Sequence, residues 1–190
     1  MDEVMTIKGK SMENKVVIGG TGRAGTTFLM KVLTYLGLNT GFSVEELDNH
    51  IDPETLGGLE VAGTEREKGA YFIKSPNYSF QIPRLANQYK IDYAIICIRD
   101  LHDASMSRVN NGLNNGGLWM ASDFESQKNQ NLKAVYQFIY DCSVYCIPVK
   151  IINFQDLILR KDCSVNTIMK ITGLPKGDVS QAIKRVQDEK

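Results

Sequence analysis

Short apolar runs alternate along the chain with longer segments whose apolar residues recur every three or four positions. The run at 92–99, DYAIICIR, is almost continuously apolar. Such runs are typical of strands buried on both faces of a parallel sheet, whereas the wider spacing is typical of amphipathic helices. The sequence predicts four strands, at residues 15–19, 70–74, 92–99 and 148–154.

Helices are predicted between these strands. The first follows the first strand and has one apolar stripe, with Gly37 suited to its C-terminal cap. A second begins with ASMSRV at 104–109 and is ended by the glycine- and asparagine-rich segment 110–117. The apolar stripe of the first helix consists of Phe28, Leu29, Val32, Leu33 and Leu36.

The remaining segments are predicted from capping and turn residues. Ser122 and Glu125 have the spacing of a capping box for a long helix at 123–145. Residues 38–69 are rich in glycine and acidic residues, so we expect loops and short helices there. Two helices, separated near 172–178, are expected to close the chain.

The order of these elements predicts the fold class. Strands that alternate with helices indicate an α/β protein with a parallel sheet and right-handed crossovers. We expect three layers, with a central parallel sheet of four to five strands flanked by helices. The binding site should lie at the carboxyl ends of the strands. A polar leader at 1–14 is expected to precede a single domain at 15–190.

Charge and hydropathy narrow the classes of function. Lysines and arginines together number 22, as do aspartates and glutamates, so the net charge does not point to nucleic acid or an anionic membrane. No apolar stretch approaches the roughly 20 residues of a membrane span, and the N-terminal MDEVMTIKGKSMENK has no signal-peptide core. We therefore expect a cytoplasmic protein without nucleic-acid or membrane partners.

The cysteines and histidines show no pattern of metal ligands. Cys97, Cys142, Cys146 and Cys163 form no C-x-x-C pair, and the chain has two histidines. Cys142 and Cys146 are expected on one face of a helix, with no histidine nearby in the sequence. We interpret all four as reduced packing residues and expect no metal site.

The segment after the first strand has the composition of an anion-binding loop. Gly20 and Gly25 enclose four residues, and Thr26 stands where a nucleotide-hydrolysing P-loop has lysine. Such a loop can hold an anion with its backbone N–H groups and the positive end of the next helix, where Thr26 and Thr27 add hydroxyls. Arg23 can replace the lysine, since its guanidinium donates two hydrogen bonds to a phosphate. The alternative is a turn that binds no ligand.

Two segments resemble the nucleotide-binding motifs of sulfotransferases. GGTGRAGTTFLMKVL, at 19–33, is similar to the loop that binds the 5′-phosphosulfate, most closely in the tyrosylprotein and carbohydrate branches. YAIICIRDLHDASMSR, at 93–108, resembles the segment that binds the 3′-phosphate, in which a strand ends in arginine and a serine follows eight residues later. Arg99 and Ser107 have that spacing. The resemblance implies a three-layer fold like that of the P-loop NTPases.

Further segments extend the resemblance over most of the chain. YFIKSPN at 71–77 and VKIINFQDLILRKDCSVNTIMKITGLP at 149–175 resemble later family segments in the same order. The R-x-G-x-x-G-x-W segment of many family members is absent. Without the resemblance, Arg99 would be read as the partner of a nearby aspartate and Ser107 as a solvated helix residue.

The resemblance implies the donor and the residues that bind it. The sulfuryl group of 3′-phosphoadenosine 5′-phosphosulfate passes in line to a hydroxyl or amine, and adenosine 3′,5′-bisphosphate is released without a metal. Lys74, at the end of the second strand, is expected to contact the sulfuryl group; the alternative is a snorkelling surface lysine. The residues expected to bind the donor are Gly22, Arg23, Ala24, Gly25, Thr26, Thr27, Arg99 and Ser107.

The acceptor must also lose a proton. In the tyrosylprotein branch a glutamate follows the first helix, which makes Glu45 the first candidate for the base and Glu46, Asp48 and His50 the alternatives. Each of them could instead be a solvated surface residue. The acceptor could be a sugar, a peptide tyrosine, a lipid or a small metabolite with an accessible hydroxyl, and the sequence leaves the oligomeric state open.

Two other functions compete with this interpretation. A P-loop kinase or NTPase would need the loop lysine and an acidic residue for Mg²⁺, for which Asp100 is the nearest counterpart. The second is a nucleotide-binding domain without catalysis, because the second phosphate loop is missing and no base stands out.

Overall fold

The computed structural model describes residues 12–111 and 117–189. Its centre is a four-stranded sheet in the order β2-β1-β3-β4, in which every neighbouring pair is parallel. The strands are β1 (Asn14–Gly20), β2 (Phe72–Lys74), β3 (Lys90–Ile98) and β4 (Val149–Asn153). The predicted α/β class and parallel sheet are confirmed, and the strand bounds differ from the predicted ones by at most two residues. Most of the predicted leader lies outside the described residues.

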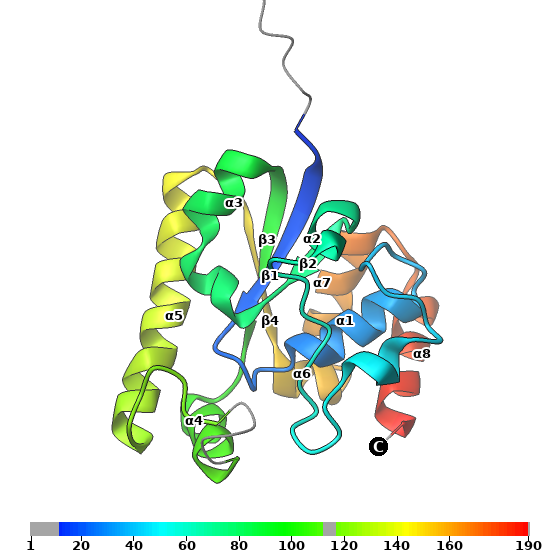
Figure 1. The fold of residues 1–190 in the computed structure, drawn as a ribbon. Coiled ribbons are helices and arrows are strands. Elements are labelled where there is room, and N and C mark those ends of the chain that lie inside the picture. The colour runs from blue at the N-terminus through cyan, green and yellow to red at the C-terminus, as the bar shows by residue number, and fades with distance from the viewer. Residues whose placement is uncertain (1–11, 112–116, 190) are drawn as a thin grey trace, which may run out of the picture.

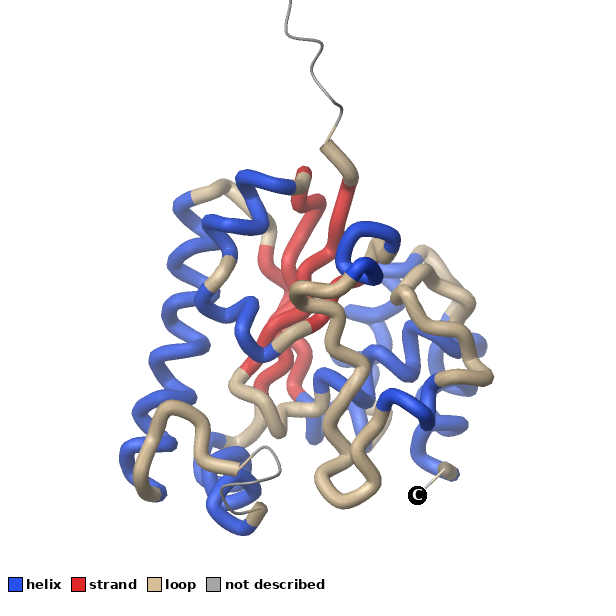
Figure 2. The backbone as a smooth tube through the Cα atoms, viewed as in Figure 1, coloured by secondary structure: helices blue, strands red, loops and turns tan. Residues whose placement is uncertain are grey.

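Helices cover both faces of this sheet. Figure 1 shows α3, α4 and α5 on one side and α1, α7 and α8 on the other, and Figure 2 shows the strands between the two groups. Two 3₁₀ helices, Leu47–His50 and Pro76–Phe80, lie in the connections. The α-helices are α1 (Thr26–Tyr35), α2 (Glu65–Gly69), α3 (Ile82–Gln88), α4 (Leu101–Asn110), α5 (Phe124–Val144), α6 (Phe154–Ile158), α7 (Asp162–Thr172) and α8 (Lys176–Asp188).

The core lies against the central strand β1. Val16, Val17 and Ile18 are fully buried, because helices cover both faces of the strand. From α1, Leu29 and Leu33 of the predicted stripe are also fully buried. The packing of β1 and α1 fixes the loop that joins them.

Capping residues explain where the structure departs from the predicted helix bounds. Helix α4 begins at Leu101, earlier than predicted, because the Asp100 side chain accepts the Asp103 N–H at 3.0 Å. Helix α6 follows β4 directly, capped by the Asn153 side chain, so three helices close the chain instead of two. Helix α3 was not predicted, and residues 112–116 of the predicted helix-ending segment lie outside the described residues.

The long helix α5 matches its prediction closely, but its capping box is shifted by one residue. Asp123 Oδ1 accepts the Ser126 N–H at 2.8 Å, and Ser126 Oγ accepts the Asp123 N–H at 3.0 Å. The extended backbone of Asp123 suits an N-cap, and aspartate caps as well as serine. Cys146 lies beyond the helix end with a positive φ of 54°, so it does not share a helix face with Cys142 as predicted.

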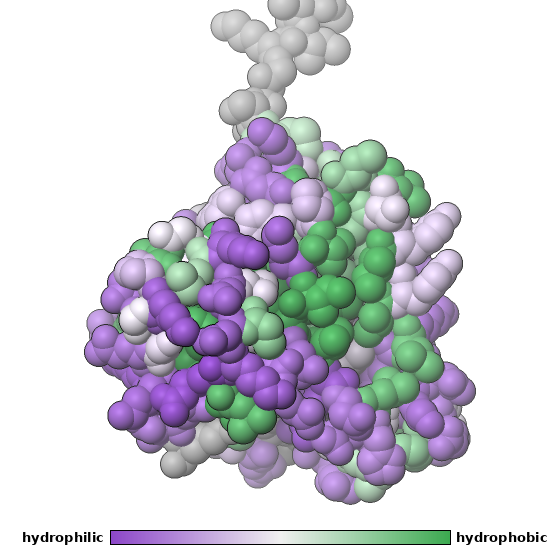
Figure 3. Space-filling view, turned by 180° about the vertical axis from the view of Figure 1, so that it is seen from behind, coloured by the Kyte–Doolittle hydropathy of each residue, from purple (hydrophilic) through white to green (hydrophobic). Residues whose placement is uncertain are grey.

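Apolar and aromatic side chains are exposed on the outer side of α5 and β4. Figure 3 shows apolar residues gathered on this side of the molecule. No helix of the described residues is long and apolar enough to cross a membrane. The large exposed side chains of α5 and β4 are Leu132, Tyr136, Ile139, Tyr140, Val144 and Ile151.

Replacing Asp123 by alanine should test the shifted cap. The variant loses the acceptor for the Ser126 N–H, so the free energy of unfolding should fall by about 1 kcal/mol in urea titrations. Ser122→Ala, which removes the sequence-predicted cap, should cost clearly less. A larger loss for Ser122→Ala than for Asp123→Ala would contradict the structure.

Candidate functional site

The candidate site lies at the carboxyl ends of β1, β2 and β3. These ends point to the same edge of the sheet, where the β1–α1 loop and the N-terminus of α4 meet (Figure 1). Crevices at this edge are the usual ligand sites of parallel α/β sheets. The location agrees with the sequence prediction.

The β1–α1 loop has the backbone of an anion cradle. Gly22, Arg23 and Gly25 have positive φ angles of 65°, 58° and 82°. Gly25 is the N-cap residue of α1 and provides no side-chain cap. Among the described residues, no acceptor pairs with the backbone N–H groups of residues 22–28. Unpaired N–H groups at a helix N-terminus attract negative charge.

Close packing on both sides fixes the shape of this loop. A Cβ at Gly22 would overlap the guanidinium of Arg108, and a Cβ at Gly25 would overlap the ring of Phe154. Phe154 itself packs edge-on against Phe28 of α1, with ring centroids 5.9 Å apart. The glycines are therefore required by neighbouring side chains as well as by their φ angles.

Arg108, on α4, is a site residue that the sequence analysis missed. It is 5% exposed, its Nη2 donates to the Thr21 carbonyl at 3.0 Å, and its guanidinium lies 5.2 Å from the centre of the Trp119 ring. Burial, and then the charge of Arg23, lower the pKa of Arg108 to about 10, so it stays protonated at neutral pH. Its position directly after Ser107 in the second motif was the available signal.

A chain of hydrogen bonds positions the aromatic partner of Arg108. The backbone N–H of Trp119 donates to Gln127 Oε1 at 2.6 Å, and Gln127 Nε2 donates to Asn131 Oδ1 at 3.0 Å. Asn131 Nδ2 in turn donates to Ser105 Oγ on α4 at 3.0 Å. Helices α4 and α5 are thus linked by buried polar groups directly behind the loop.

The structure brings together the residues predicted to bind the two phosphates. Arg23 Nε donates to Ser107 Oγ at 3.1 Å, and its guanidinium also donates to the Thr55 carbonyl. Arg99 Nη1 lies 3.5 Å from the Arg23 carbonyl and Nη2 lies 3.9 Å from Asp103. Burial, and then the charge of Arg99, lower the pKa of Arg23. Ser107 lies well inside α4, because that helix begins earlier than predicted.

Lys74 is buried at the end of β2, which contradicts its interpretation as a surface lysine. It is 1% exposed, and its Nζ lies 2.7 Å from the Gly58 carbonyl and 3.4 Å from both Thr27 Oγ1 and Glu60 Oε1. Burial lowers the pKa of Lys74, and the charge of Glu60 opposes this effect. The lysine therefore lies beside the N-terminus of α1 in a desolvated setting.

Residues 51–60, which we call the 51–60 loop, cover these cations with carbonyl groups. The Thr55 carbonyl accepts from Arg23, and the Gly58 carbonyl accepts from Lys74 and from the Thr27 hydroxyl. Backbone bonds close the loop, including one from the N–H of residue 52 to the carbonyl of residue 57 at 2.8 Å. The sequence predicted only an irregular segment here.

The predicted base candidates lie apart from the anion loop. Glu45 is exposed, and its own backbone N–H and then the Ser43 hydroxyl lower its pKa. Glu46 and His50 both contact Arg66, and His50 Nε2 lies 3.3 Å from Arg66 Nη2. Asp48 Oδ1 lies 3.3 Å from Lys31 Nζ. Among the described residues, none of these four side chains forms a hydrogen bond or ion pair with residues 19–27.

Glu60 is the carboxylate that the structure brings to Lys74. No motif distinguished Glu60 in the sequence, because its role depends on a contact with a lysine in another segment. The described residues contain no cluster of three or more histidine, cysteine, aspartate or glutamate side chains that could hold a metal ion.

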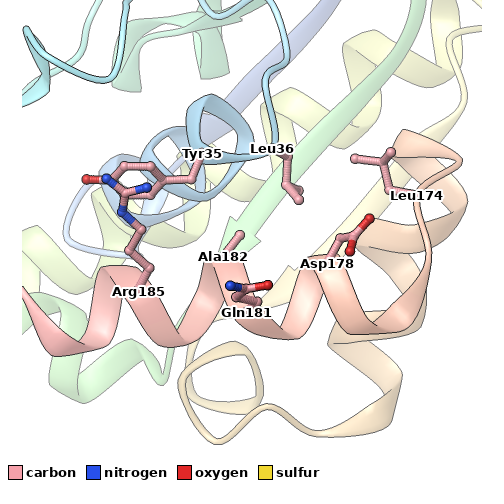
Figure 4. A pocket seen from close by; sticks show the side chains of 7 residues that line it. All are labelled: Tyr35, Leu36, Leu174, Asp178, Gln181, Ala182 and Arg185. Carbon is pink, nitrogen blue, oxygen red and sulfur yellow. The ribbon is translucent and has the colours of Figure 1, made fainter.

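A pocket in the structure lies at the other end of α1. Figure 4 shows Tyr35 and Leu36 at the C-terminal end of α1 facing Arg185 and Asp178 of α8. Because α1 rises about 1.5 Å per residue, its ten residues place this pocket roughly 15 Å from the loop. It is therefore distinct from the candidate site.

Comparisons with known proteins bear on the fold. The sulfotransferase domain of the olefin synthase from Synechococcus PCC 7002 is similar to this chain, with a TM-score of 0.58 and 14% sequence identity. The match covers 88% of this chain and 75% of that chain. No protein-family model matches the sequence, and no curated protein matches it. The chain therefore has a sulfotransferase-like α/β fold.

Replacing Lys74 by methionine should separate stability from function. The variant removes a desolvated charge while the Thr27 hydroxyl still donates to the Gly58 carbonyl. We expect the free energy of unfolding in urea titrations to stay the same or to rise, because the desolvation of a buried charge is no longer required. A large loss of stability would show that Lys74 is a structural residue.

The same variant gives a pH test. Because burial lowers the pKa of Lys74, the unfolded chain holds this proton up to a higher pH than the folded chain does. The destabilising effect of the charge is complete below the lowered pKa and disappears as the pH rises toward the ordinary lysine value. The stability advantage of Lys74→Met should therefore shrink in urea titrations at increasingly alkaline pH.

Proposed function

We propose that this protein is a sulfotransferase that moves the sulfuryl group of 3′-phosphoadenosine 5′-phosphosulfate to a hydroxyl or amine. The observation that carries the proposal is the convergence of Arg23, Lys74 and Arg99 on a helix N-terminus whose N–H groups have no acceptor among the described residues. The donor carries a 5′-phosphosulfate and a 3′-phosphate, so it needs positive charge at two places. Arg23 and Lys74 are the candidates for the first group, and Arg99 is the candidate for the second.

Each part of the donor has a chemically suitable partner. The loop N–H groups, Arg23 and the hydroxyls of Thr26 and Thr27 would bind the 5′-phosphate and stabilise the charge that develops on its leaving oxygen. Lys74, which contacts Thr27, would contact the sulfuryl oxygens. Arg99 and Ser107 would bind the 3′-phosphate. Arg108 supports the loop from behind without having to touch the donor.

The contacts of Asp100 argue against the kinase alternative. A P-loop kinase needs an acidic side chain for Mg²⁺ at the end of a strand. Asp100 follows β3, but its carboxylate caps α4 by accepting the Asp103 N–H at 3.0 Å. Thermal-shift measurements should therefore show stabilisation by adenosine 3′,5′-bisphosphate and little by ATP with Mg²⁺. The reverse preference would favour the kinase.

Arg99→Ala should weaken binding of adenosine 3′,5′-bisphosphate by about 10- to 150-fold, because it removes charge-assisted hydrogen bonds to the 3′-phosphate. Calorimetry should show a smaller loss for Ser107→Ala, about 1 kcal/mol. Adenosine 5′-phosphosulfate lacks the 3′-phosphate, so its binding should change little. Arg185→Ala is the matched control, because Arg185 belongs to α8 and lies beside the C-terminal end of α1, away from the loop. A wild-type protein that does not prefer the 3′-phosphorylated ligand would contradict the proposed donor.

Arg23→Ala should lower turnover by about 100-fold or more, because a preorganised charge near the leaving phosphate is lost. The measurement is release of adenosine 3′,5′-bisphosphate from the donor. Thr26→Lys, which restores the lysine of a nucleotide-hydrolysing loop, should not produce ATP hydrolysis. Near-normal turnover of Arg23→Ala would remove this residue from the mechanism, and robust hydrolysis by Thr26→Lys would revive the kinase alternative.

A further inference from the structure

We propose that Glu60 is the catalytic base that removes the proton from the acceptor. This inference rests on the proposed sulfotransferase function and names the residue that receives the acceptor proton. It depends on the position of Glu60 at the end of a short row of polar side chains that begins in the anion loop.

The row consists of three side chains. Thr27 Oγ1 belongs to the first turn of α1 and lies 3.4 Å from Lys74 Nζ, which lies 3.4 Å from Glu60 Oε1. The side chain of Lys74 is 2% exposed and that of Glu60 is 44% exposed. The row therefore leads from the buried anion loop to solvent, which is the direction from which an acceptor must arrive.

The backbone around Glu60 is fixed on both sides. The Leu59 N–H donates to the His50 carbonyl at 3.0 Å, and the Val61 N–H donates to the Lys74 carbonyl at 3.1 Å. The side chains of Leu59 and Val61 are almost fully buried. Glu60 is thus held next to Lys74 by its neighbours, and its carboxylate has Lys74 as its single hydrogen-bond and ion-pair partner among the described residues.

Other carboxylates near the site form ion pairs or hydrogen bonds with groups other than Lys74. Asp103 pairs with Arg99 and accepts from Gln155 Nε2 at 3.3 Å, at the end of the site assigned to the 3′-phosphate. Asp52 Oδ1 accepts two backbone N–H groups of the 51–60 loop. Glu46 is paired with Arg66. Of these groups, Glu60 alone is next to the lysine assigned to the sulfuryl oxygens.

In the proposed step, one bond to sulfur forms as another breaks. The acceptor oxygen attacks sulfur and forms a new S–O bond, while the bond from sulfur to the bridging oxygen of the 5′-phosphate breaks. That oxygen keeps the electron pair and leaves as part of adenosine 3′,5′-bisphosphate. The acceptor proton moves to the Glu60 carboxylate, which can return it to solvent because the side chain is half exposed.

Glu60→Gln tests the inference with phenols of different acidity as acceptor probes. Removing a general base typically lowers turnover by about 100- to 10,000-fold. We expect a loss in this range with phenol, and a much smaller loss with 4-nitrophenol, which ionises by itself near neutral pH. A merely structural role for Glu60 would lower both rates equally. Glu60→Asp should recover part of the turnover with phenol. Glu65→Gln, an exposed residue paired with Lys68, is the matched control and should leave both rates unchanged.

Binding measurements distinguish failure of this inference from failure of the proposed function. Calorimetry should show that Glu60→Gln binds adenosine 3′,5′-bisphosphate as the wild type does. A wild type that does not bind this ligand would overturn the sulfotransferase function and the inference with it. A wild type that binds the ligand and sulfates phenol, with equal turnover by Glu60→Gln, would overturn the inference alone. Loss of turnover in Glu45→Gln but not in Glu60→Gln would do the same.

Discussion

Burial of positive charge around the β1–α1 loop is the constraint on which the site depends. Arg108 lies behind Gly22 and Lys74 lies beside Thr27, and both side chains are almost completely removed from solvent. Much of their hydrogen bonding is to backbone carbonyls, of Thr21 for Arg108 and Gly58 for Lys74. A carbonyl satisfies a donor but does not neutralise its charge. Keeping these charges buried therefore costs free energy, and burial accordingly lowers the pKa values of both groups. A bound anion would offset this cost.

The source of this charge differs from that of a nucleotide-hydrolysing P-loop, in which the loop itself supplies the lysine. Here the cations come from the loop, the ends of β2 and β3, and α4. They meet only because parallel strands place their carboxyl ends at one edge of the sheet. The charge of the site is therefore a property of the folded chain.

The 51–60 loop connects charge burial to the chemistry that we propose. Its carbonyls face Arg23 and Lys74, and its last residue, Glu60, supplies a carboxylate next to Lys74. The same segment thus accepts hydrogen bonds from the cations and carries a group able to accept a proton.

The sequence by itself determined the elements whose signals are local. The apolar runs located all four strands, the stripe from Phe28 to Leu36 located α1, and the glycine spacing located the loop. Capping was harder, since Ser122 and Asp123 are neighbours that can both cap a helix, and the backbone conformation selected Asp123. Helix α3 was missed for a similar reason, because its seven residues carry too short a pattern.

Only the tertiary structure decided which side chains complete the site. Arg108 reaches Thr21 across 87 positions of the sequence, and Lys74 reaches Gly58 across 16. The exposure of Glu45 and the proximity of Glu60 to Lys74 were equally invisible in the sequence. Periodicity and motif spacing report interactions within a few residues along the chain. The charges and pKa values of this site arise from burial and from contacts between segments that only the packing of helices on the sheet brings together.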